Sequence, residues 1–230
     1  MKQYLYLLVL FFIISCSKKD DQVPKESFFF NDDFTTGTDG WVASFADYPV
    51  GNETFYELRT FHATLPAPID PADRAIFISG NNHSDDLFMY LKKEFTGLKP
   101  NTSYSVKFTL DVASNAPSGA VGVGGPPGEG VAFGIGVTTN EPLNVVATNG
   151  YYRLNVDKGN QGTSGPARKV IGNIANGFDT WRYVLLRKEG TFSFTTDNTG
   201  KAWATVSTDS GFEATTSLYY SKINIEFRED

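Results

Sequence analysis

Cysteine, histidine and methionine are scarce in this chain of 230 residues, which has one cysteine, two histidines and two methionines. A single cysteine cannot form a disulfide framework, and two histidines leave little room for a Ser-His-Asp triad or a zinc site. The phosphate-binding patterns GxGxxG and GxxxxGK[ST] are absent, and so is the GxSxG motif of serine hydrolases. The sequence therefore excludes a disulfide-stapled fold and gives no support to nucleophilic or nucleotide-dependent catalysis.

The chain also lacks an apolar run long enough to cross a bilayer. The run from Tyr4 to Ile14 has about eleven residues, whereas roughly twenty are needed. Lys2 precedes it, and it ends in Ile13-Ile14-Ser15-Cys16. This order of charged, apolar and small residues resembles a bacterial lipoprotein signal peptide. The resemblance implies cleavage before Cys16 and a lipid on its thiol, which leaves no thiol for catalysis.

The residues after the cysteine suggest a destination. Ser17-Lys18-Lys19-Asp20-Asp21 looks like the Lys/Asp tag that sends some Gram-negative lipoproteins to the outside of the outer membrane. We therefore expect residues 1–15 to be the signal peptide, residues 16–27 to be the lipidated cysteine with a flexible tether, and residues 28–230 to form one domain. The expected location is the outer membrane, with a lipid anchor and exposure at the cell surface.

Charge and composition narrow the class of protein. The formal net charge of -6 repels a phosphate backbone, so nucleic acid is not an expected partner. The 19 Phe, 11 Tyr and 22 Gly are typical of short aromatic-rich strands joined by tight turns. The composition therefore predicts an all-β protein.

Apolar and polar residues alternate with a period of two along residues 104–112, 131–137 and 219–227, which predicts strands with one buried face. Within the second segment, Ala132, Gly134 and Gly136 indicate an outer face that is crowded or approached by a ligand. No stretch has a helical period. We expect further strands at residues 75–79, 87–91, 143–147, 151–156, 181–188, 191–196 and 202–207, with turns at 38–40, 99–101, 188–190 and 197–200. About ten short strands with frequent turns predict a two-sheet antiparallel β-sandwich.

Three sequence segments resemble the carbohydrate-binding-module-like, or galactose-binding-like, jelly rolls. The first is Asn31-Asp32-Asp33-Phe34 followed by Gly40-Trp41, and the second is Gly97-Leu98-Lys99-Pro100 followed by alternating residues from Tyr104 to Phe108. The third is the aromatic-rich end of the chain, from Trp181 to Phe227. The resemblance implies a jelly roll with Trp41 and Trp181 in the core, and a glycan as partner.

Many such jelly rolls hold a structural calcium between the opening strand and an Asp-Asp pair in the last strand. Asp33 remains here as the one metal ligand that the resemblance implies, but the matching pair reads Ser221-Lys222. A lysine repels calcium, so the site lacks part of its charge. No other cofactor is expected.

The densest polar stretch runs from Ser79 to Asp86 and is the first choice for a binding site. Asn82, His83, Asp85 and Asp86 offer the amide and carboxylate groups that hydrogen-bond sugar hydroxyls or bind calcium. The alternative is a solvated loop whose side chains cap their own turns.

Two further loops and one tryptophan are candidates. The glycine-rich loop from Ser114 to Gly130 is long for a sandwich and contains Glu129, which is either a surface residue or the partner of Asp85 or Asp86. The loop from Asn155 to Gly165 is either a polar binding loop or a flexible hairpin. Trp203, between two alanines, is the preferred stacking platform for a sugar ring.

The leading hypothesis is a non-catalytic, lipid-anchored surface protein that binds a glycan or a glycan-bearing surface. Its site would combine Trp203 with Asn82, His83, Asp85, Asp86 and Glu129. A second hypothesis is a polysaccharide hydrolase or lyase that uses a carboxylate pair from these residues. A third is a structural or adhesive lipoprotein whose jelly roll packs against another protein.

Overall fold

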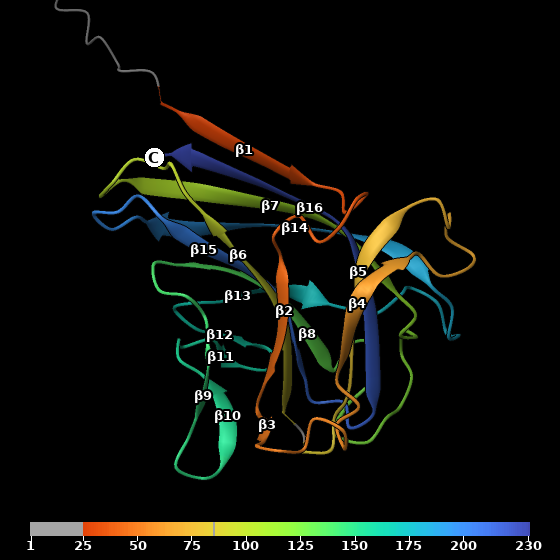
Figure 1. Cartoon of the computed structure of the whole chain (residues 1–230). Coiled ribbons are helices and arrows are strands. Elements are labelled where there is room, and N and C mark those ends of the chain that lie inside the picture. The colour runs from red at the N-terminus through yellow and green to blue at the C-terminus, as the bar shows by residue number, and fades with distance from the viewer. Residues whose placement is uncertain (1–24, 85) are drawn as a thin grey trace, which may run out of the picture.

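The computed structural model describes residues 25–84 and 86–230, and every regular element in them is a β-strand (Figure 1). In this part of the chain no helix is long and apolar enough to cross a membrane. The expected signal peptide, Cys16 and most of the expected tether lie outside the described residues. The strands are β1 (Ser27–Asp32), β2 (Val42–Ala46), β3 (Tyr48–Pro49), β4 (Arg59–Thr64), β5 (Arg74–Asn81), β6 (Leu87–Phe95), β7 (Ser103–Ser114), β8 (Val131–Thr138), β9 (Asn144–Val146), β10 (Tyr151–Leu154), β11 (Gly159–Asn160), β12 (Thr163–Ser164), β13 (Lys169–Asn173), β14 (Val184–Thr195), β15 (Ala202–Ser210) and β16 (Thr215–Glu229).

Two large antiparallel sheets form the body of the protein. Sheet A has the order β14-β7-β16-β5-β4, and β1 pairs with the C-terminal half of β16. Sheet B has the order β13-β8-β15-β6-β2. The protein is therefore the all-β, two-sheet sandwich of jelly-roll type that the sequence predicts.

One apolar core lies between the two sheets. The alternating apolar residues of β7 from Tyr104 to Val112 and those of β8 from Val131 to Val137 are all buried in it. In β16 a bulge between Tyr220 and Lys222 shifts the register, and the buried face resumes at Ile223. Burial of these faces supplies the main driving force for folding, at about 25 cal/mol per Å² of apolar surface.

One predicted turn and one predicted core residue are wrong. Residues 188–190 lie inside β14, which continues without a break. Gly190 stands there because a Cβ would come within 2.7 Å of Ile171 and 2.9 Å of Ile135, both from sheet B. Close packing between the sheets, rather than a turn, therefore explains Gly190.

Trp181, which was predicted to be a core residue, lies in the loop before β14 and is 59% exposed.

The chain itself covers the outer face of sheet B. Residues 139–168, called the arm below, leave β8, carry the short strands β9 to β12 and return as β13 (Figure 1). A Cβ on Gly134 would clash with the Arg168 side chain, and one on Gly136 would clash with the carbonyl oxygen of Ala167. The small residues of β8 therefore serve the close approach of the arm, which is the crowded alternative that the sequence left open.

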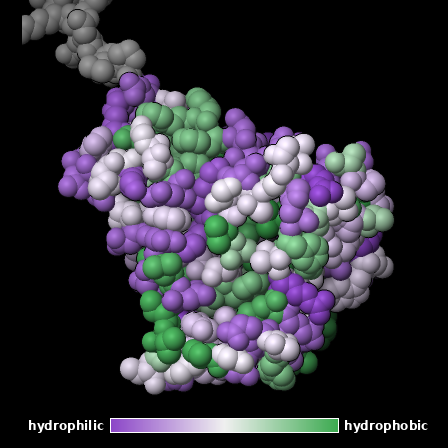
Figure 2. All heavy atoms as spheres, viewed as in Figure 1, coloured by the Kyte–Doolittle hydropathy of each residue, from purple (hydrophilic) through white to green (hydrophobic). Residues whose placement is uncertain are grey.

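The arm also presents apolar residues to solvent. Its β9–β10 hairpin exposes Leu143, Val145 and Val146. Figure 2 shows the apolar patch at the lower left of the view, over this hairpin. The patch is small and lies on the arm rather than on either large sheet.

Strand direction divides the loops between two ends of the sandwich. Ser27 pairs with Arg228, so the first described residues lie at the same end as the C-terminus. Because the paired strands are antiparallel, the connections β5–β6, β7–β8, β13–β14 and β15–β16 gather at the opposite end, called the distal rim below. Two of the loops predicted as candidate sites, residues 79–86 and 114–130, therefore converge on one rim.

Replacement of Gly136 by alanine tests the packing of the arm on β8. Overpacking of this kind costs about 1–3 kcal/mol, so we expect Gly136→Ala to lower the free energy of unfolding by about 2 kcal/mol. Urea denaturation followed by tryptophan fluorescence measures this change. The matched control is Gly162→Ala, because a Cβ on this arm glycine meets nothing within 4 Å. Equal stability of both variants would show that the arm does not rest on β8 in solution.

Candidate functional site

The asparagine of the first-choice loop has a structural role. Asn82 is buried, and its Nδ2 donates hydrogen bonds to the carbonyl oxygens of Ser210 at 2.8 Å and Phe212 at 3.1 Å. Its Oδ1 accepts hydrogen bonds from the backbone N–H groups of Ser84 at 3.1 Å and Asp86 at 3.3 Å. Asn82 therefore caps its own loop and ties it to the β15–β16 connection.

His83 belongs to an aromatic stack, whereas Asp86 lines a polar hollow of about 240 Å³ with Asp47, Arg153 and Lys158. His83 is exposed and stacks on Phe55, with ring centroids 4.1 Å apart and an interplanar angle of 26°. Its Nε2 lies 3.1 Å from the carbonyl oxygen of Phe55. Phe55 is itself 60% exposed, so the pair is an aromatic stack on the distal rim. Asp85 lies outside the described residues.

Asp86 belongs to an ion network beneath the arm. Nη1 of Arg153 lies 2.7 Å from Oδ1 of Asp47 and 3.0 Å from Oδ2 of Asp86. Nζ of Lys158 lies 2.9 Å from Oδ2 of Asp47 and 2.7 Å from Oδ2 of Asp209. The arm supplies the cations, whereas the carboxylates come from β15 and from the chain beside β2 and β6. The network therefore fastens the arm to the body of the sandwich.

Arg168 completes the network and is buried with it. Its Nε donates to Oγ of Ser207 at 3.0 Å, and its Nη2 donates to the carbonyl oxygen of Ala132 at 2.9 Å. Its Nη1 donates to the carbonyl oxygen of Gln161 at 2.9 Å and lies 3.8 Å from Oδ2 of Asp209. The guanidinium thus holds the end of the arm over Gly134.

Burial and neighbouring charges shift the protonation equilibria of the network. Burial, followed by the negative charge of Asp47, raises the pKa of Asp86 to about 6. Burial disfavours the charge on Lys158, but Asp209 and Asp47 outweigh it and raise the pKa of the ammonium group. Burial lowers the pKa of Arg168, which Asp209 opposes.

The same three carboxylates have the spacing of a metal site. One oxygen each from Asp47, Asp86 and Asp209 lie within 4.8 Å of one another. Three cationic side chains already balance these charges, however, and the ammonium of Lys158 contacts two of the three carboxylates. A divalent ion would add uncompensated charge to a buried, balanced network. We therefore interpret the network as structural.

Glu129 lies on the distal rim but outside this carboxylate group. It is exposed, and its Oε1 accepts a hydrogen bond of 3.0 Å from the backbone N–H of Gly119. The only group of three or more potential metal ligands in residues 25–84 and 86–230 contains Asp86 but not Glu129. The carboxylates beside Asp86 are Asp47 and Asp209, both buried against Lys158. Among the described residues, Glu129 therefore does not join the carboxylate group of Asp86, and its pairing with Asp85 stays a prediction.

The remaining sequence-predicted residues lie elsewhere. Trp203 is half-buried on the outer face of sheet B, with Nζ of Lys92 5.7 Å from its ring centroid. Ala202, at the start of β15, is at the end of the sandwich opposite the distal rim. The structure therefore separates Trp203 from the other predicted site residues.

Asp33 does not fit a calcium site. Its Oδ1 accepts hydrogen bonds from the backbone N–H of Thr35 at 3.0 Å and from Oγ1 of Thr35 at 2.7 Å. The hollow around it is also lined by one further carboxylate and two cations, Asp73, Arg74 and Lys222. Hydrogen bonds from Thr35, with a smaller contribution from Lys222, lower the pKa of Asp33. The two cations offset the two carboxylates, so this hollow lacks the net negative charge that favours a divalent cation.

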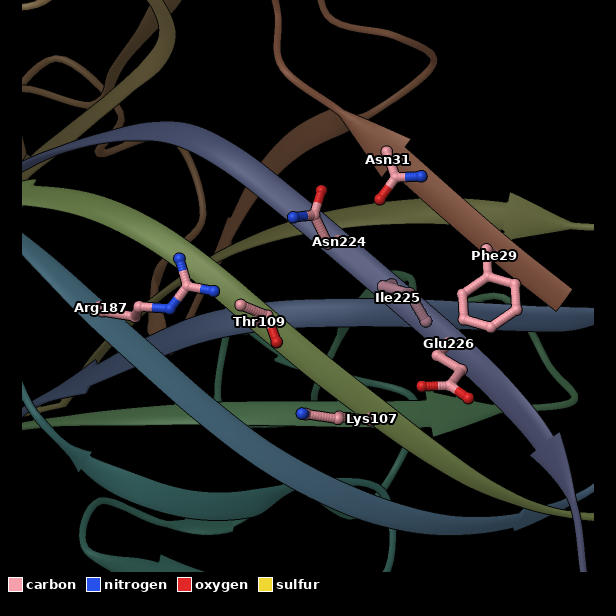
Figure 3. Close-up of a pocket in the computed structure, with 8 residues that line it drawn as sticks. All are labelled: Phe29, Asn31, Lys107, Thr109, Arg187, Asn224, Ile225 and Glu226. Atoms are coloured by element: carbon pink, nitrogen blue, oxygen red, sulfur yellow. The ribbon is translucent and has the colours of Figure 1, made fainter. Parts of the chain in front are cut away.

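A groove that the sequence did not predict crosses the outer face of sheet A (Figure 3). Its volume is about 180 Å³, and its floor is formed by β1, β16, β7 and β14. Asn31, Asn224 and Thr109 form a row across three neighbouring strands, because Asn31 pairs with Asn224 and Asn224 with Thr109. The next row begins with Phe29, followed by Glu226 and Lys107.

The side chains of the groove are available to a ligand. Phe29 is 65% exposed. Within residues 25–84 and 86–230, the side chains of Asn31, Asn224 and Lys107 make no hydrogen bond or ion pair. Arg187, at the edge of the groove, is held by Glu189 at 3.1 Å and Asp111 at 3.3 Å. The groove therefore combines one exposed ring with unpartnered amides.

An aromatic band lies on the same face, nearer the distal rim. The ring centroid of Phe77 lies 4.6 Å from that of Phe61 and 4.8 Å from that of Tyr219. Tyr183 makes an edge contact with Tyr219 at 5.4 Å. Burial and the neighbouring Tyr219 raise the pKa of Tyr183 to about 12. The outer face of sheet A is thus polar along β1 and aromatic along β4 and β5.

A sequence signal for part of this groove exists. Asn224 and Glu226 alternate with the buried Ile223, Ile225 and Phe227, so the period of two already places them on the outer face. Which strands lie beside β16, and hence which other residues share this face, is not a property of one strand. The groove is therefore a product of strand order.

Comparisons with known proteins give distant likenesses. No family model matches the sequence, and no curated protein matches it. An arabinose-bound α-L-arabinofuranosidase is 13% identical with a TM-score of 0.43, and the match covers 89% of this chain and 25% of that one. A xylan-binding domain from CBM 22 is 12% identical with a TM-score of 0.36, covering 86% and 96%. An adhesin domain of Lys-gingipain from Porphyromonas gingivalis is 10% identical with a TM-score of 0.39, covering 86% and 97%.

This chain spans only about a quarter of the length of the arabinofuranosidase. The likenesses are too distant to carry an argument about function, which must come from the surface of this molecule. The fold and the groove together define a class: a jelly-roll β-sandwich with one face covered by its own chain and one face open.

The pH dependence of stability tests the environment of Asp86. Its pKa of about 6 in the folded protein exceeds the usual value of about 3.9, so the native state binds this proton more tightly than the unfolded chain does. The contribution of Asp86 to the free energy of unfolding therefore increases as the pH falls from about 7 to about 5. As the pH falls over this range, we expect the free energy of unfolding of the wild type to rise by about 1 kcal/mol relative to that of Asp86→Asn.

Urea denaturation at several pH values measures this difference. The control is Asp33→Asn, because the pKa of Asp33 is lowered and its protonation falls below this range. If the difference in free energy of unfolding between the wild type and Asp86→Asn did not change between about pH 7 and about pH 5, the raised pKa of Asp86 would be contradicted.

Proposed function

We propose that this protein is a non-catalytic glycan-binding protein and that the groove on the outer face of sheet A is its binding site. One observation carries the proposal: the row Asn31, Asn224 and Thr109 offers unpartnered polar groups beside the exposed ring of Phe29. A sugar has an apolar ring face and a rim of hydroxyl groups. The groove offers a partner for each.

The chemistry of recognition follows from these side chains. The ring of Phe29 covers the apolar face of a sugar, and the amides of Asn31 and Asn224 both donate and accept hydrogen bonds with hydroxyl groups. Lys107 and Glu226 add one donor group and one acceptor group in the next row. The groove is shallow, so little area is buried and the affinity per site is modest.

The groove does not suit glycoside hydrolysis. Hydrolysis of this kind requires two carboxyl groups on either side of the scissile bond. Glu226 is the only carboxylate among the residues that line the groove. Binding without turnover is therefore the function that these residues support.

The proposed location is the outer membrane surface, with a lipid on Cys16 as anchor. This part of the proposal rests on the sequence, through the signal-like residues 1–15 and the Lys/Asp tag that follows the cysteine. The first described residues lead into β1, which forms one border of the groove. A tether from the membrane would thus reach the sandwich beside its open face.

Alanine variants of the groove test the proposed site. A hydrogen bond contributes about 1 kcal/mol net, and a factor of ten corresponds to about 1.4 kcal/mol. We expect Asn31→Ala with Asn224→Ala to weaken glycan binding about tenfold or more, and Phe29→Ala to weaken it similarly. A glycan array identifies a ligand for the wild type, and isothermal titration calorimetry then compares the variants.

The matched control is Trp203→Ala, which removes the ring predicted from the sequence on the other sheet. The proposal requires that this variant bind like the wild type. Loss of binding in Trp203→Ala, with full binding in the groove variants, would place the site on sheet B. No bound glycan on the array would count against the function itself.

A further inference from the structure

The most deeply buried lysine contact in the ion network joins Lys158 of the arm to Asp209 of β15. Nζ of Lys158 lies 2.7 Å from Oδ2 of Asp209, and the side chains are only 9% and 0% exposed. The two residues are 51 positions apart in the chain. The contact therefore brings an amine and a carboxyl group together where little solvent reaches either of them.

The surroundings of this pair resemble a reaction site more than an ordinary surface ion pair. A second carboxylate, Asp47, has its Oδ2 2.9 Å from the same Nζ. The ring of Phe88 lies 4.8 Å below the amine. On Asp209, Oδ2 accepts a hydrogen bond of 2.9 Å from the backbone N–H of Gln161, whereas Oδ1 is buried and has no hydrogen-bond partner.

The geometry points to a covalent bond: Nζ of Lys158 and Cγ of Asp209 form an intramolecular amide, with loss of one water molecule. The amide joins the arm to sheet B. It does for this protein what a disulfide does for others, in a chain whose single cysteine cannot form one internally.

The step balances without any other reactant. Nζ of Lys158 first gives one proton to the Asp47 carboxylate, which turns a buried ion pair into two neutral groups. The free amine then adds to Cγ of Asp209, and the charge that develops on Oδ2 faces the Gln161 N–H and Nη1 of Arg168 at 3.8 Å. The proton on Asp47 and a second proton from Nζ pass to Oδ1, the Cγ–Oδ1 bond breaks, and water leaves.

Proximity and burial both favour this reaction. Well-oriented groups in one molecule react with effective concentrations of about 10⁵–10⁸ M, and the bond needs to form only once in each chain. The product is neutral, so two buried charges disappear. The two remaining carboxylates, Asp47 and Asp86, keep their contacts with Arg153, and Arg168 keeps its hydrogen bonds to Ser207, Ala132 and Gln161. Two carboxylates and two guanidinium groups remain, so the formal charge of the network is still zero after the bond has formed.

A second pair in the same protein provides an internal comparison. Nζ of Lys93 also lies 2.7 Å from an aspartate oxygen, Oδ2 of Asp32, and also lies near a ring, 5.3 Å from that of Phe95. This amine has no second carboxylate within ion-pair distance among the described residues. Oδ2 of Asp32 also accepts a hydrogen bond from Nε1 of Trp41. Lys93 and Asp32 should therefore remain an ion pair.

Peptide mapping of the full chain tests the proposal. The protein is purified in detergent, denatured, digested with trypsin and analysed by tandem mass spectrometry. An amide on Lys158 blocks cleavage there, so we expect a branched peptide that joins residues 154–168 to residues 202–222, one water lighter than the sum of the two. Lys93 and Asp32 are expected only in linear peptides.

Three variants distinguish a covalent bond between Lys158 and Asp209 from an ion pair between them. Lys158→Arg keeps the charge and gives only linear peptides. Asp209→Asn gives a branched peptide of the same mass, because ammonia leaves in place of water. Asp47→Asn removes the proton acceptor and lowers the branched fraction about a hundredfold at equal times. Full recovery of linear peptides 154–158 and 202–222 from folded wild-type protein would overturn the proposal, whatever the result of glycan binding.

Discussion

The pairing of Lys158 with Asp209 and Asp47 decides which face of this sandwich is open to solvent. It lies beneath the arm, and Arg168 beside it anchors the end of the arm over Gly134. A buried contact of this kind holds the arm to β15, first as an ion pair and then through the amide inferred above. The arm therefore stays on sheet B, and only sheet A offers a broad open face.

The open face has two chemically different halves. Along β1 and β16 the outward residues are polar, and Phe29 is an exposed ring beside them. Along β4 and β5 the outward residues form the aromatic band of Phe61, Phe77 and Tyr219. A sheet whose two faces are both buried is apolar on each face and has no surface on which such polar and aromatic regions could be exposed. A single-sided sheet can bind a ligand because its second face is free of the core.

The alternation of apolar and polar residues predicted the long central strands well. Residues 104–112, 131–137 and 219–227 lie in β7, β8 and β16, because each buries one face in the same core. Strands β1, β2, β4 and β13 gave no such signal, since their residues are mostly half-buried or exposed at the borders of the sheets. The turn expected at residues 188–190 was wrong because Gly190 serves contact with the other sheet.

The candidate site was harder to predict than the fold. Polar residues such as Asn82 and Asp86 stand out in the sequence, but the structure uses Asn82 to cap a loop and Asp86 in the ion network. The sequence by itself determined that the chain forms strands with one apolar face, and hence a β-sandwich. Composition and the period of two are local properties of the chain and can be read without the structure. Only the tertiary structure decided which strands are neighbours. It alone brought Asn31 beside Asn224, and Lys158 beside Asp209, because contacts between distant segments depend on strand order.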